Sequence, residues 1–500
     1  MKAYKRIIST IAAAAFALSL AACGADSDSE SSASPTAESA QTVYKGEREL
    51  LLSDSGITLD GEAIAEGETG DVTVSHDIVY YHEGMGSDYG EGTDSDGHSA
   101  EEADAHTVVT IRASGVYRLS GTLSQGQIAV DLGDSAEDDP DAVVTLILDN
   151  ADVTCTVAPA LIFYNVYECG STDEETAAPD VDTSGAGANV IIADGSVNNF
   201  TGSYVARIYK EGTTDKLHKY DGAFYSKMSM NVSGEADGDG VLNITAENEG
   251  LDTELHLTIN GGVINIQAEN DGINTNEDNV SVTTINGGTL NIDAGLGAEG
   301  DGIDSNGWLV INGGSVFASA CAAGGDSGLD ASVDIVINGG TVIGLGNMLD
   351  AVSDESAQEY LTVTLNEAVE AGQTVELCDA SGEAIFSFIA PKTASMLLLS
   401  DAQLTSGGDY ALTVDGQERE YSSGAGGFPG GGMPGGMDVP EGFEDWLESD
   451  QNIPDDIRAW LENLMEAGAR GQGAPGGGRF GNPGGEPPDG EAPEAPPSGA

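Results

Sequence analysis

Four short segments in the middle of the chain place polar residues on either side of a glycine and an aliphatic residue. They read EGLD, DGIN, DGID and SGLD, with glycines at 250, 272, 302 and 328, so the intervals are 22, 30 and 26 residues. Glycine permits tight backbone turns. We expect the aliphatic residue of each segment to point inward and the flanking carboxylates to lie outside. The uneven intervals indicate a rim where insertions are tolerated, which is where ligands usually bind.

Carboxylate and amide oxygens on flexible turns are the ligands that calcium prefers. A further acidic turn, DGDG, adds two carboxylates upstream of the four segments. The spacing matches neither an EF-hand loop nor the calcium-binding nonapeptide repeat. The alternative left open is a set of solvated acidic turns that keep the edges of the fold soluble. The expected calcium ligands, from neighbouring repeats, are Asp237, Asp239, Asp252, Asp271, Asn274, Asp301, Asp304 and Asp330.

The elements that must position these carboxylates repeat along the sequence. The tetrapeptide INGG begins at Ile259, Ile285, Ile311 and Ile337, always 26 residues apart. Short runs such as VINIQA and TLNIDA follow it, with alternating apolar positions and no helical periodicity. The fixed interval predicts an all-β fold, a parallel β-helix with about 26 residues per coil. An antiparallel sandwich with hairpins at Asn-Gly is the alternative, but it does not explain why one register persists over three intervals.

The asparagines of INGG are expected to stack at one corner of the coil. Asn260, Asn286, Asn312 and Asn338 would then join their side-chain amides into a ladder. The two glycines after each asparagine supply the positive backbone angles of the turn. Direct contact between these asparagines and a ligand is the less favoured alternative.

The charge of the chain restricts its partners. It holds 17 Lys and Arg against 85 Asp and Glu, a net charge of −68. This argues against a nucleic-acid partner, whose affinity comes from basic residues, and it means that an anionic ligand needs cations between itself and the protein.

Basic residues are concentrated in residues 207–227, which form a solvated loop, a contact for an anionic sugar or, least favoured of the three, the source of a catalytic base. Residues 231–350 contain no Lys or Arg, so the repeats cannot supply the basic residue that polysaccharide lyases of such folds use as a base. We therefore expect a protein that is not an enzyme. Trp308 follows an acidic turn and is the preferred stacking residue, with core packing as its alternative. The expected carbohydrate contacts are Trp308, Tyr220, Lys216, Lys219 and Lys227.

The ends of the chain differ from the repeats. Residues 1–22 have the layout of a signal peptide, and LAAC looks like a bacterial lipobox, which implies a lipid on Cys23 and attachment to the extracellular face of the cell membrane. A polar tether (23–41), the repeat domain (42–350) and an antiparallel β capping unit (351–420) follow. The last segment, 421–500, is a Gly/Pro-rich acidic tail, disordered by composition, with a short helix at 441–468.

Two features of the repeat domain stay open. Cys155 and Cys169 are near enough in sequence for a disulfide, but spacing does not establish connectivity. Four of the six histidines lie at 76, 82, 98 and 106, in or beside the acidic insert 80–106. They could hold a transition metal, but their irregular spacing favours disorder of this insert.

Several motifs in order resemble one known family. They are GVYRLSGTL, LILDNADVT, AFYSK, the NGG and DGI coils and FSFIAPKTASMLLLS, spread over about residues 105–420. The chain resembles the bacterial cell-surface carbohydrate-binding domain-containing β-helix family, which is similar in shape to pectate lyases. The resemblance implies a right-handed parallel β-helix that binds calcium and an acidic plant-type polysaccharide such as polygalacturonate, or cellulose, without established catalysis. Asn274 and Asp304 stand where relatives often have lysine, which favours a cation there.

The leading hypothesis is a lipid-anchored extracellular β-helix that binds acidic polysaccharide through calcium bridges. The second is a surface adhesin or structural protein whose tail recruits a protein partner. A pectate-lyase-like enzyme is the third.

Overall fold

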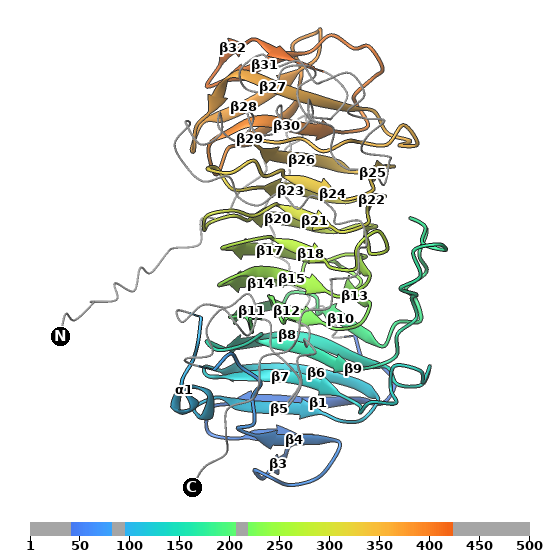
Figure 1. The fold of residues 1–500 in the computed structure, drawn as a ribbon, viewed down its shortest axis with the longest axis vertical. Helices are drawn as coiled ribbons and strands as arrows, with labels where there is room; N and C mark the ends of the chain where they lie inside the picture. Colours follow the sequence, from blue (N-terminus) through green and yellow to red (C-terminus); the bar gives the residue numbers. More distant parts are fainter. Residues whose placement is uncertain (1–41, 83–95, 207–218, 424–500) are drawn as a thin grey trace, which may run out of the picture. The chain divides into compact units, whose positions relative to one another are not determined.

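The computed structural model describes residues 42–82, 96–206 and 219–423. They form a fold built almost wholly of β-strands, most of them in parallel stacks (Figure 1). Each repeat contributes three strands in order: one to a nine-stranded sheet and two to a twenty-stranded sheet. Residues of the signal peptide, the tether and Cys23 lie outside the described residues, as do Lys216 and most of the tail, including the segment 441–468 for which a helix is predicted.

The nine-stranded sheet is parallel except at its first pair, where β4 runs antiparallel to β5. Its strands, in spatial order, are β4 (Val72–Ser75), β5 (Thr107–Ile111), β7 (Gly126–Asp131), β9 (Leu161–Asn165), β12 (Gly222–Ser226), β15 (Glu249–Thr253), β18 (Ile273–Thr275), β21 (Ile303–Ser305) and β24 (Leu329–Ala331).

The large sheet contains two parallel runs, one on each side of the INGG corners. The first run is β10 (Ala188–Ile192), β13 (Met230–Gly234), β16 (Leu257–Ile259), β19 (Val282–Ile285), β22 (Trp308–Ile311) and β25 (Asp334–Ile337). The second run is β8 (Val144–Thr154), β11 (Val197–Gly202), β14 (Val241–Ala246), β17 (Val263–Ala268), β20 (Thr289–Asp293), β23 (Ser315–Ser319) and β26 (Thr341–Gly346).

The strands pair in the register that the repeat predicts. Ile264 lies opposite Leu290, Leu290 opposite Val316, and Val316 opposite Val342, each pair in parallel strands. Parallel pairing excludes the antiparallel sandwich for the repeats. Within β17, Ile264 and Ile266 are fully buried while Asn265 and Gln267 face outward. Burying one such aliphatic side chain contributes about 1.5–3 kcal/mol, and β20 adds the equivalent pair Leu290 and Ile292 to the core.

Asparagines join consecutive repeats by side-chain hydrogen bonds. At the INGG corners the amide Nδ2 of Asn286, Asn312 and Asn338 each donates to the Oδ1 of the preceding asparagine at 2.9 Å. The predicted ladder is therefore confirmed. A second ladder runs along the outer face of the large sheet, with distances of 2.8 to 2.9 Å, through Asn291, Asn265, Asn243 and Asn199.

Antiparallel strands cover both ends of the large sheet. At the first end, β1 (Glu47–Ser53) pairs parallel with β6 (Gly115–Leu123), while β2 (Ile57–Leu59) and β3 (Glu62–Ile64) add antiparallel strands. At the other end, β27 (Tyr360–Val369), β30 (Ala394–Ser400) and β33 (Tyr421–Ser422) are antiparallel. A separate four-stranded antiparallel sheet holds β28 (Thr374–Cys378), β29 (Ala384–Ile389), β31 (Ala411–Val414) and β32 (Gln417–Arg419).

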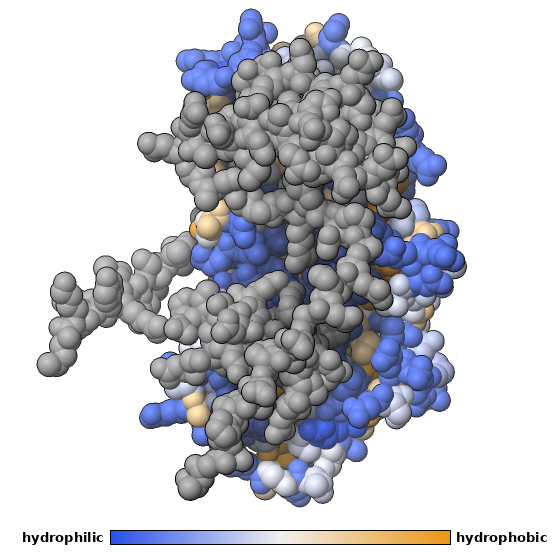
Figure 2. Space-filling view, in the orientation of Figure 1, coloured by the Kyte–Doolittle hydropathy of each residue, from blue (hydrophilic) through white to orange (hydrophobic). Residues whose placement is uncertain are grey.

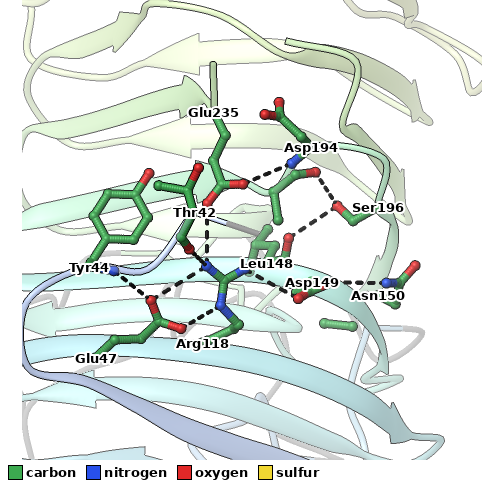
Figure 3. A network of polar contacts seen from close by, with 12 residues as sticks. Thr42, Tyr44, Glu47, Arg118, Leu148, Asp149, Asn150, Asp194, Ser196 and Glu235 are labelled. Carbon is green, nitrogen blue, oxygen red and sulfur yellow. Dashed lines mark hydrogen bonds and ion pairs between the residues drawn. The ribbon is translucent and has the colours of Figure 1, made fainter. Parts of the chain in front are cut away.

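A buried arginine ties the first strands together (Figure 3). Arg118 on β6 is 5% exposed and donates from Nε to Glu47 at 2.6 Å. Its other nitrogens reach Asp149 at 3.2 Å, Glu235 at 3.3 Å and the carbonyl oxygen of Thr42 at 2.7 Å. Three carboxylates thus surround one guanidinium that stands between β1, β8 and the turn after β13. Removing it would leave uncompensated buried charge, which costs several kcal/mol.

The structure corrects two predictions made from the sequence and answers one question that the sequence left open. The insert 80–106 is not wholly irregular, because Ala100–Asp104 form α1, with Ser99 as N-cap and a capping box with Glu102. The tail was predicted to begin at 421, but Tyr421 pairs with Leu365 of β27. Cys155 and Cys169 are both free thiols.

The described residues offer hydrophilic surface and no spanning helix. On the face drawn in Figure 2, the visible described residues are mostly hydrophilic. None of the helices in the described ranges has the length and apolar character needed to cross a membrane.

Candidate functional site

At the glycine of each EGLD, DGIN or DGID segment, the direction that a Cβ would take faces the interior of the fold. This backbone orientation determines on which side of the sheet the flanking acids lie. A Cβ on Gly272 would stand 2.1 Å from the Ile292 side chain and 2.5 Å from the carbonyl oxygen of Gly302. The next residue, Ile273, is fully buried in the core, as are its counterparts Leu251 and Ile303. Two successive residues thus occupy the inner side, and the flanking polar residues both emerge on the outer side of the nine-stranded sheet. The predicted inward direction of the aliphatic residues is confirmed.

The flanking side chains form two neighbouring columns on that outer side. In one, the register places Asp252 beside Asn274, Asn274 beside Asp304, and Asp304 beside Asp330. In the other, Glu249, Asp271 and Asp301 follow one another, because Gly250 N–H donates to Asp271 O and Gly272 N–H to Asp301 O. We call these side chains the carboxylate face: Glu249, Asp252, Asp271, Asn274, Asp301, Asp304 and Asp330.

The carboxylate face is largely buried, contrary to the open rim predicted from the sequence. Asp252 is 0%, Glu249 3% and Asn274 6% exposed. Asp301, Asp304 and Asp330 are half-buried. The expectation that these carboxylates lie on an open rim is therefore wrong for the first repeats, where the acids have lost most of their contact with water.

Burial and mutual repulsion raise the pKa of every carboxyl on this face. Burial, reinforced by neighbouring carboxylates, raises the pKa of Asp304 and Asp330 to about 7. The pKa of Asp271 also rises to about 7, although the Asp301 N–H that donates to it acts in the opposite direction. The pKa values of Glu249, Asp252 and Asp301 lie well above the usual range, again chiefly because of burial. Such a site favours a proton or a bound cation over bare negative charge.

Hydrogen bonds satisfy only part of the carboxylate face. Asp252 accepts from Asn276 Nδ2 at 2.7 Å through Oδ1, and Asp271 accepts the Asp301 N–H at 2.6 Å. Three buried oxygens have no hydrogen-bond partner: Glu249 Oε2, Asp252 Oδ2 and Asn274 Oδ1. A buried polar atom without a partner costs about 1–3 kcal/mol, more if charged.

These three oxygens have the chemistry that a calcium ion requires, since all are hard oxygen acceptors. Glu249, Asp252 and Asn274 are the residues that would hold an ion at this end of the face. As they stand, no three His, Cys, Asp or Glu side chains of the described ranges converge on one metal position. An ion would therefore have to draw in the Asn274 amide oxygen and a backbone or water oxygen beside the two carboxylates.

Asp237 and Asp239 do not belong to this face. They lie in the turn between β13 and β14, on the side of the INGG corners. There the Asp237 N–H donates to Asp194 at 3.0 Å, and Asp239 accepts the Gly195 N–H at 2.7 Å. The predicted set of calcium ligands is thus divided between two places, with six of its eight members on the carboxylate face and two at another turn.

The predicted carbohydrate contacts fall in different surroundings. Trp308 is half-buried at the start of β22 and belongs to neither buried apolar cluster, so the core-packing alternative for it is not supported. Tyr220, in contrast, is 6% exposed and packs against Tyr164 and Tyr225 with ring centroids 5.6 and 5.3 Å apart. Its prediction as a surface contact is wrong, because its ring is part of the core.

The two described lysines of the basic segment also differ. The ammonium group of Lys219 lies 2.8 Å from the buried Asp221 carboxylate. Lys227 is half-buried at the end of β12, and its backbone N–H donates to Phe163 O.

Two acids of this region, Glu249 on the carboxylate face and Asp350 beside it, were not predicted. Glu249 occupies the same motif position as Asp271 and Asp301, a signal that was available in the sequence. Asp350 accepts the Ala331 N–H at 3.0 Å and so extends the face beyond Asp330. The sequence feature that could have identified Asp350 is the dipeptide Leu-Asp, which also ends the segments EGLD and SGLD. Burial raises the pKa of Asp350, as it does for the members of the face.

A solved structure and a family model are similar to parts of this chain. A solved structure, the polysaccharide lyase-like protein from C. thermocellum (gadolinium derivative), is 19% identical, with 62% of this chain and 92% of that chain covered and a TM-score of 0.35. No curated protein matches the chain. The model of the "Carbohydrate-binding domain-containing protein" family matches residues 105–387, which is more than half of the sequence and includes the whole carboxylate face. The chain belongs to this carbohydrate-binding domain-containing family.

Proposed function

We propose that this chain is an extracellular, lipid-anchored protein that binds an acidic polysaccharide of the polygalacturonate type through calcium and is not an enzyme. Family membership supports the binding of polysaccharide. The proposal includes a right-handed β-helix with about 26 residues per coil as the scaffold. It also includes a signal peptide at 1–22 and a lipid on Cys23 that holds the protein at the extracellular face of the membrane.

The observation that carries the proposal is the set of buried oxygens without a partner on the carboxylate face. Glu249 Oε2, Asp252 Oδ2 and Asn274 Oδ1 are buried and have no hydrogen-bond partner. A calcium ion coordinates such oxygens and compensates the charge that burial makes costly. The net charge of −68 repels an acidic polymer. A bound calcium ion provides a positive centre to which the carboxylates of that polymer bind.

A sugar ring needs a further contact, and Trp308 is suitably placed. It follows Asp304 by four residues and remains half-exposed outside both apolar clusters. Aromatic rings present a large apolar face at low entropic cost. We propose that Trp308 and Lys227 contact the polymer while the carboxylate face holds the bridging ions.

The distribution of basic residues supports binding without catalysis. Residues 231–350 contain no Lys or Arg, and the lysine that reaches the repeats from outside, Lys392, is engaged by Asp293 at 3.0 Å and by the carbonyl oxygen of Ala294. Lys219 is paired with Asp221. General-base chemistry needs a group free to accept a proton from the substrate, and these ammonium groups are held by carboxylates.

The proposal is tested by binding of polygalacturonate to the purified chain in calcium and in chelator. We expect binding in calcium and its loss in chelator. The double variant Asp252→Asn, Asp304→Asn should weaken binding in calcium at least about tenfold, equal to 1.4 kcal/mol. No unsaturated uronate product should accumulate, as followed by ultraviolet absorbance.

The matched control is Asp237→Asn, Asp239→Asn, which removes the same charge at the turn that contacts Asp194 and Gly195. It should bind like the wild type. Retention of binding in chelator, or an equal loss in the control, would contradict calcium bridging at the carboxylate face.

A further inference from the structure

Lys219 stands at the end of the carboxylate face and is held there by its neighbours in sequence. Tyr220 is anchored in the core, and its backbone N–H and carbonyl both bond to Val205, at 3.1 and 2.9 Å. One residue farther along the chain, the carbonyl oxygen of Asp221 accepts the Glu249 N–H at 3.2 Å. The backbone that follows Lys219 is therefore fixed against the first repeat of the face.

The ammonium group of Lys219 acts on several acids together. Its contact with Asp221 is 2.8 Å, and the Asp221 carboxylate is 3% exposed. Its positive charge also lowers the otherwise raised pKa values of Glu249, Asp252 and Asp271, which burial and neighbouring acids raise. Asp301, Asp304 and Asp330, farther along the face, show no such influence of a positive charge.

The ammonium group of Lys219 cannot neutralise all the carboxylates at this end of the carboxylate face or bond to all their oxygens. It carries a single positive charge against Asp221, Glu249, Asp252 and Asp271. The oxygens Glu249 Oε2, Asp252 Oδ2 and Asn274 Oδ1 still lack partners in its presence. An ammonium donates through three hydrogens from one point, whereas a calcium ion accepts six to eight oxygens around itself.

We propose that the side chain of Lys219 is a tethered cation that competes with divalent ions for the Glu249–Asp252–Asn274 end of the carboxylate face. The ammonium lies beside Asp221 and already offsets part of the negative charge of this end, so a second cation there meets its direct repulsion. The lysine thus sets the affinity of this end and leaves the repeats beyond it as the stronger sites. This inference rests on the proposed function, because it assumes that the face binds calcium.

The test is calorimetric titration of calcium into the full chain and into Lys219→Met, which keeps the apolar stem and removes the charge. The variant should bind calcium at this end at least about tenfold more tightly than the wild type. Lys219→Arg should restore wild-type affinity. The control is Lys45→Met, an exposed lysine whose charge is not among the influences on Glu249, Asp252 or Asp271, and it should bind calcium like the wild type.

Melting in chelator and in calcium gives a second readout, since an ion that binds only the native state raises the melting temperature. The calcium-dependent rise should be larger in Lys219→Met than in the wild type. If the variant is unfolded in chelator, calcium should refold it. Equal affinities and equal rises in the two proteins, or failure of calcium to refold the variant, would overturn the role of Lys219. Absence of calcium binding to the wild type would instead overturn the proposed function.

Discussion

The INGG corners and the carboxylate face repeat in the same stack of strands but solve their hydrogen bonding in opposite ways. At the corners, Asn286 donates to Asn260 and accepts from Asn312, both at 2.9 Å. On the carboxylate face, Asp304 lies between Asn274 and Asp330 in the same kind of parallel register. There, burial raises the pKa of Asp304 to about 7, with the charges of nearby acids adding to the effect.

The difference comes from the side-chain chemistry of the two repeated residues. An amide both donates and accepts, so a stack of asparagines satisfies itself, whereas an ionised carboxylate only accepts. A stack of aspartates therefore remains incomplete until protons or cations enter it. A self-sufficient ladder indicates a scaffold, and an incomplete one indicates a binding site.

The largest effect on stability should come from replacing a glycine that sets the backbone direction in one of the two regions. Gly272→Ala places a Cβ 2.1 Å from the Ile292 side chain and 2.5 Å from a backbone oxygen. Overpacking of this kind costs about 1–3 kcal/mol, and we expect the upper part of that range because a backbone atom must move. Urea unfolding in chelator measures it.

Gly261 at an INGG corner provides the matched comparison. A Cβ there would meet its nearest atom, the Gly234 nitrogen, at 3.4 Å. Gly261→Ala should cost less than about 1 kcal/mol. Equal losses in the two variants would show that the inward direction of Gly272 does not control the carboxylate face.

The second effect concerns pH. The pKa values of Asp271, Asp304 and Asp330 rise to about 7 in the folded protein, mainly through burial. In the unfolded chain an aspartate titrates near 3.9. Between these values the folded state binds more protons, so in chelator the free energy of unfolding should fall as pH rises from about 4 to about 7, and then level off.

Asp304→Asn removes one group from this linkage. The variant should lose less stability than the wild type between about pH 5 and about pH 8, and at the higher pH it should be the more stable protein. Urea unfolding at the two pH values in chelator checks this. Identical pH dependence in both proteins would mean that Asp304 does not hold its proton as described.

The smallest effect should come from the corner ladder. Asn286→Ala removes two exposed hydrogen bonds of 2.9 Å, whereas Asn338→Ala removes one of that length at the end of the ladder. At a net 0.5–1.5 kcal/mol per bond, with exposed bonds at the low end, we expect about 1 kcal/mol for Asn286 and about half of that for Asn338. Thermal or urea unfolding measures both. A larger loss at Asn338 would contradict a ladder whose members act alike.

Much of the scaffold was predictable because its order is local and periodic. The 26-residue interval alone predicts that Ile264, Leu290 and Val316 share one register, and the strands pair in that register. The second asparagine ladder had a partial signal, the shared asparagine in VLNITA, VINIQA and TLNIDA. Its first member, Asn199, lies 44 residues before Asn243 and escapes the period.

The state of the site was not predictable, because it depends on what packs against the outer face. The same Asp-Gly-Ile pattern is compatible with exposed or with buried carboxylates. What decides between them is the surroundings of Asp252 and Asn274, contributed by residues that no local spacing identifies. Likewise Arg118 joins Glu47 and Glu235, which are 71 and 117 residues away in the sequence.

The Arg118 network also gives the first strand a mechanical property. β1 runs parallel to β6 over seven paired residues, from Glu47 beside Val116 to Ser53 beside Thr122. A pull on Thr42 along the strand therefore loads all these pairs in shear at once, instead of opening them one after another. The Arg118 guanidinium donates hydrogen bonds to the Thr42 carbonyl oxygen and to Glu47, at the end of the strand to which this force is applied. The strand is thus built to resist traction from the side of the chain that leads to residue 42, and it would yield far more readily to a force that lifts it sideways.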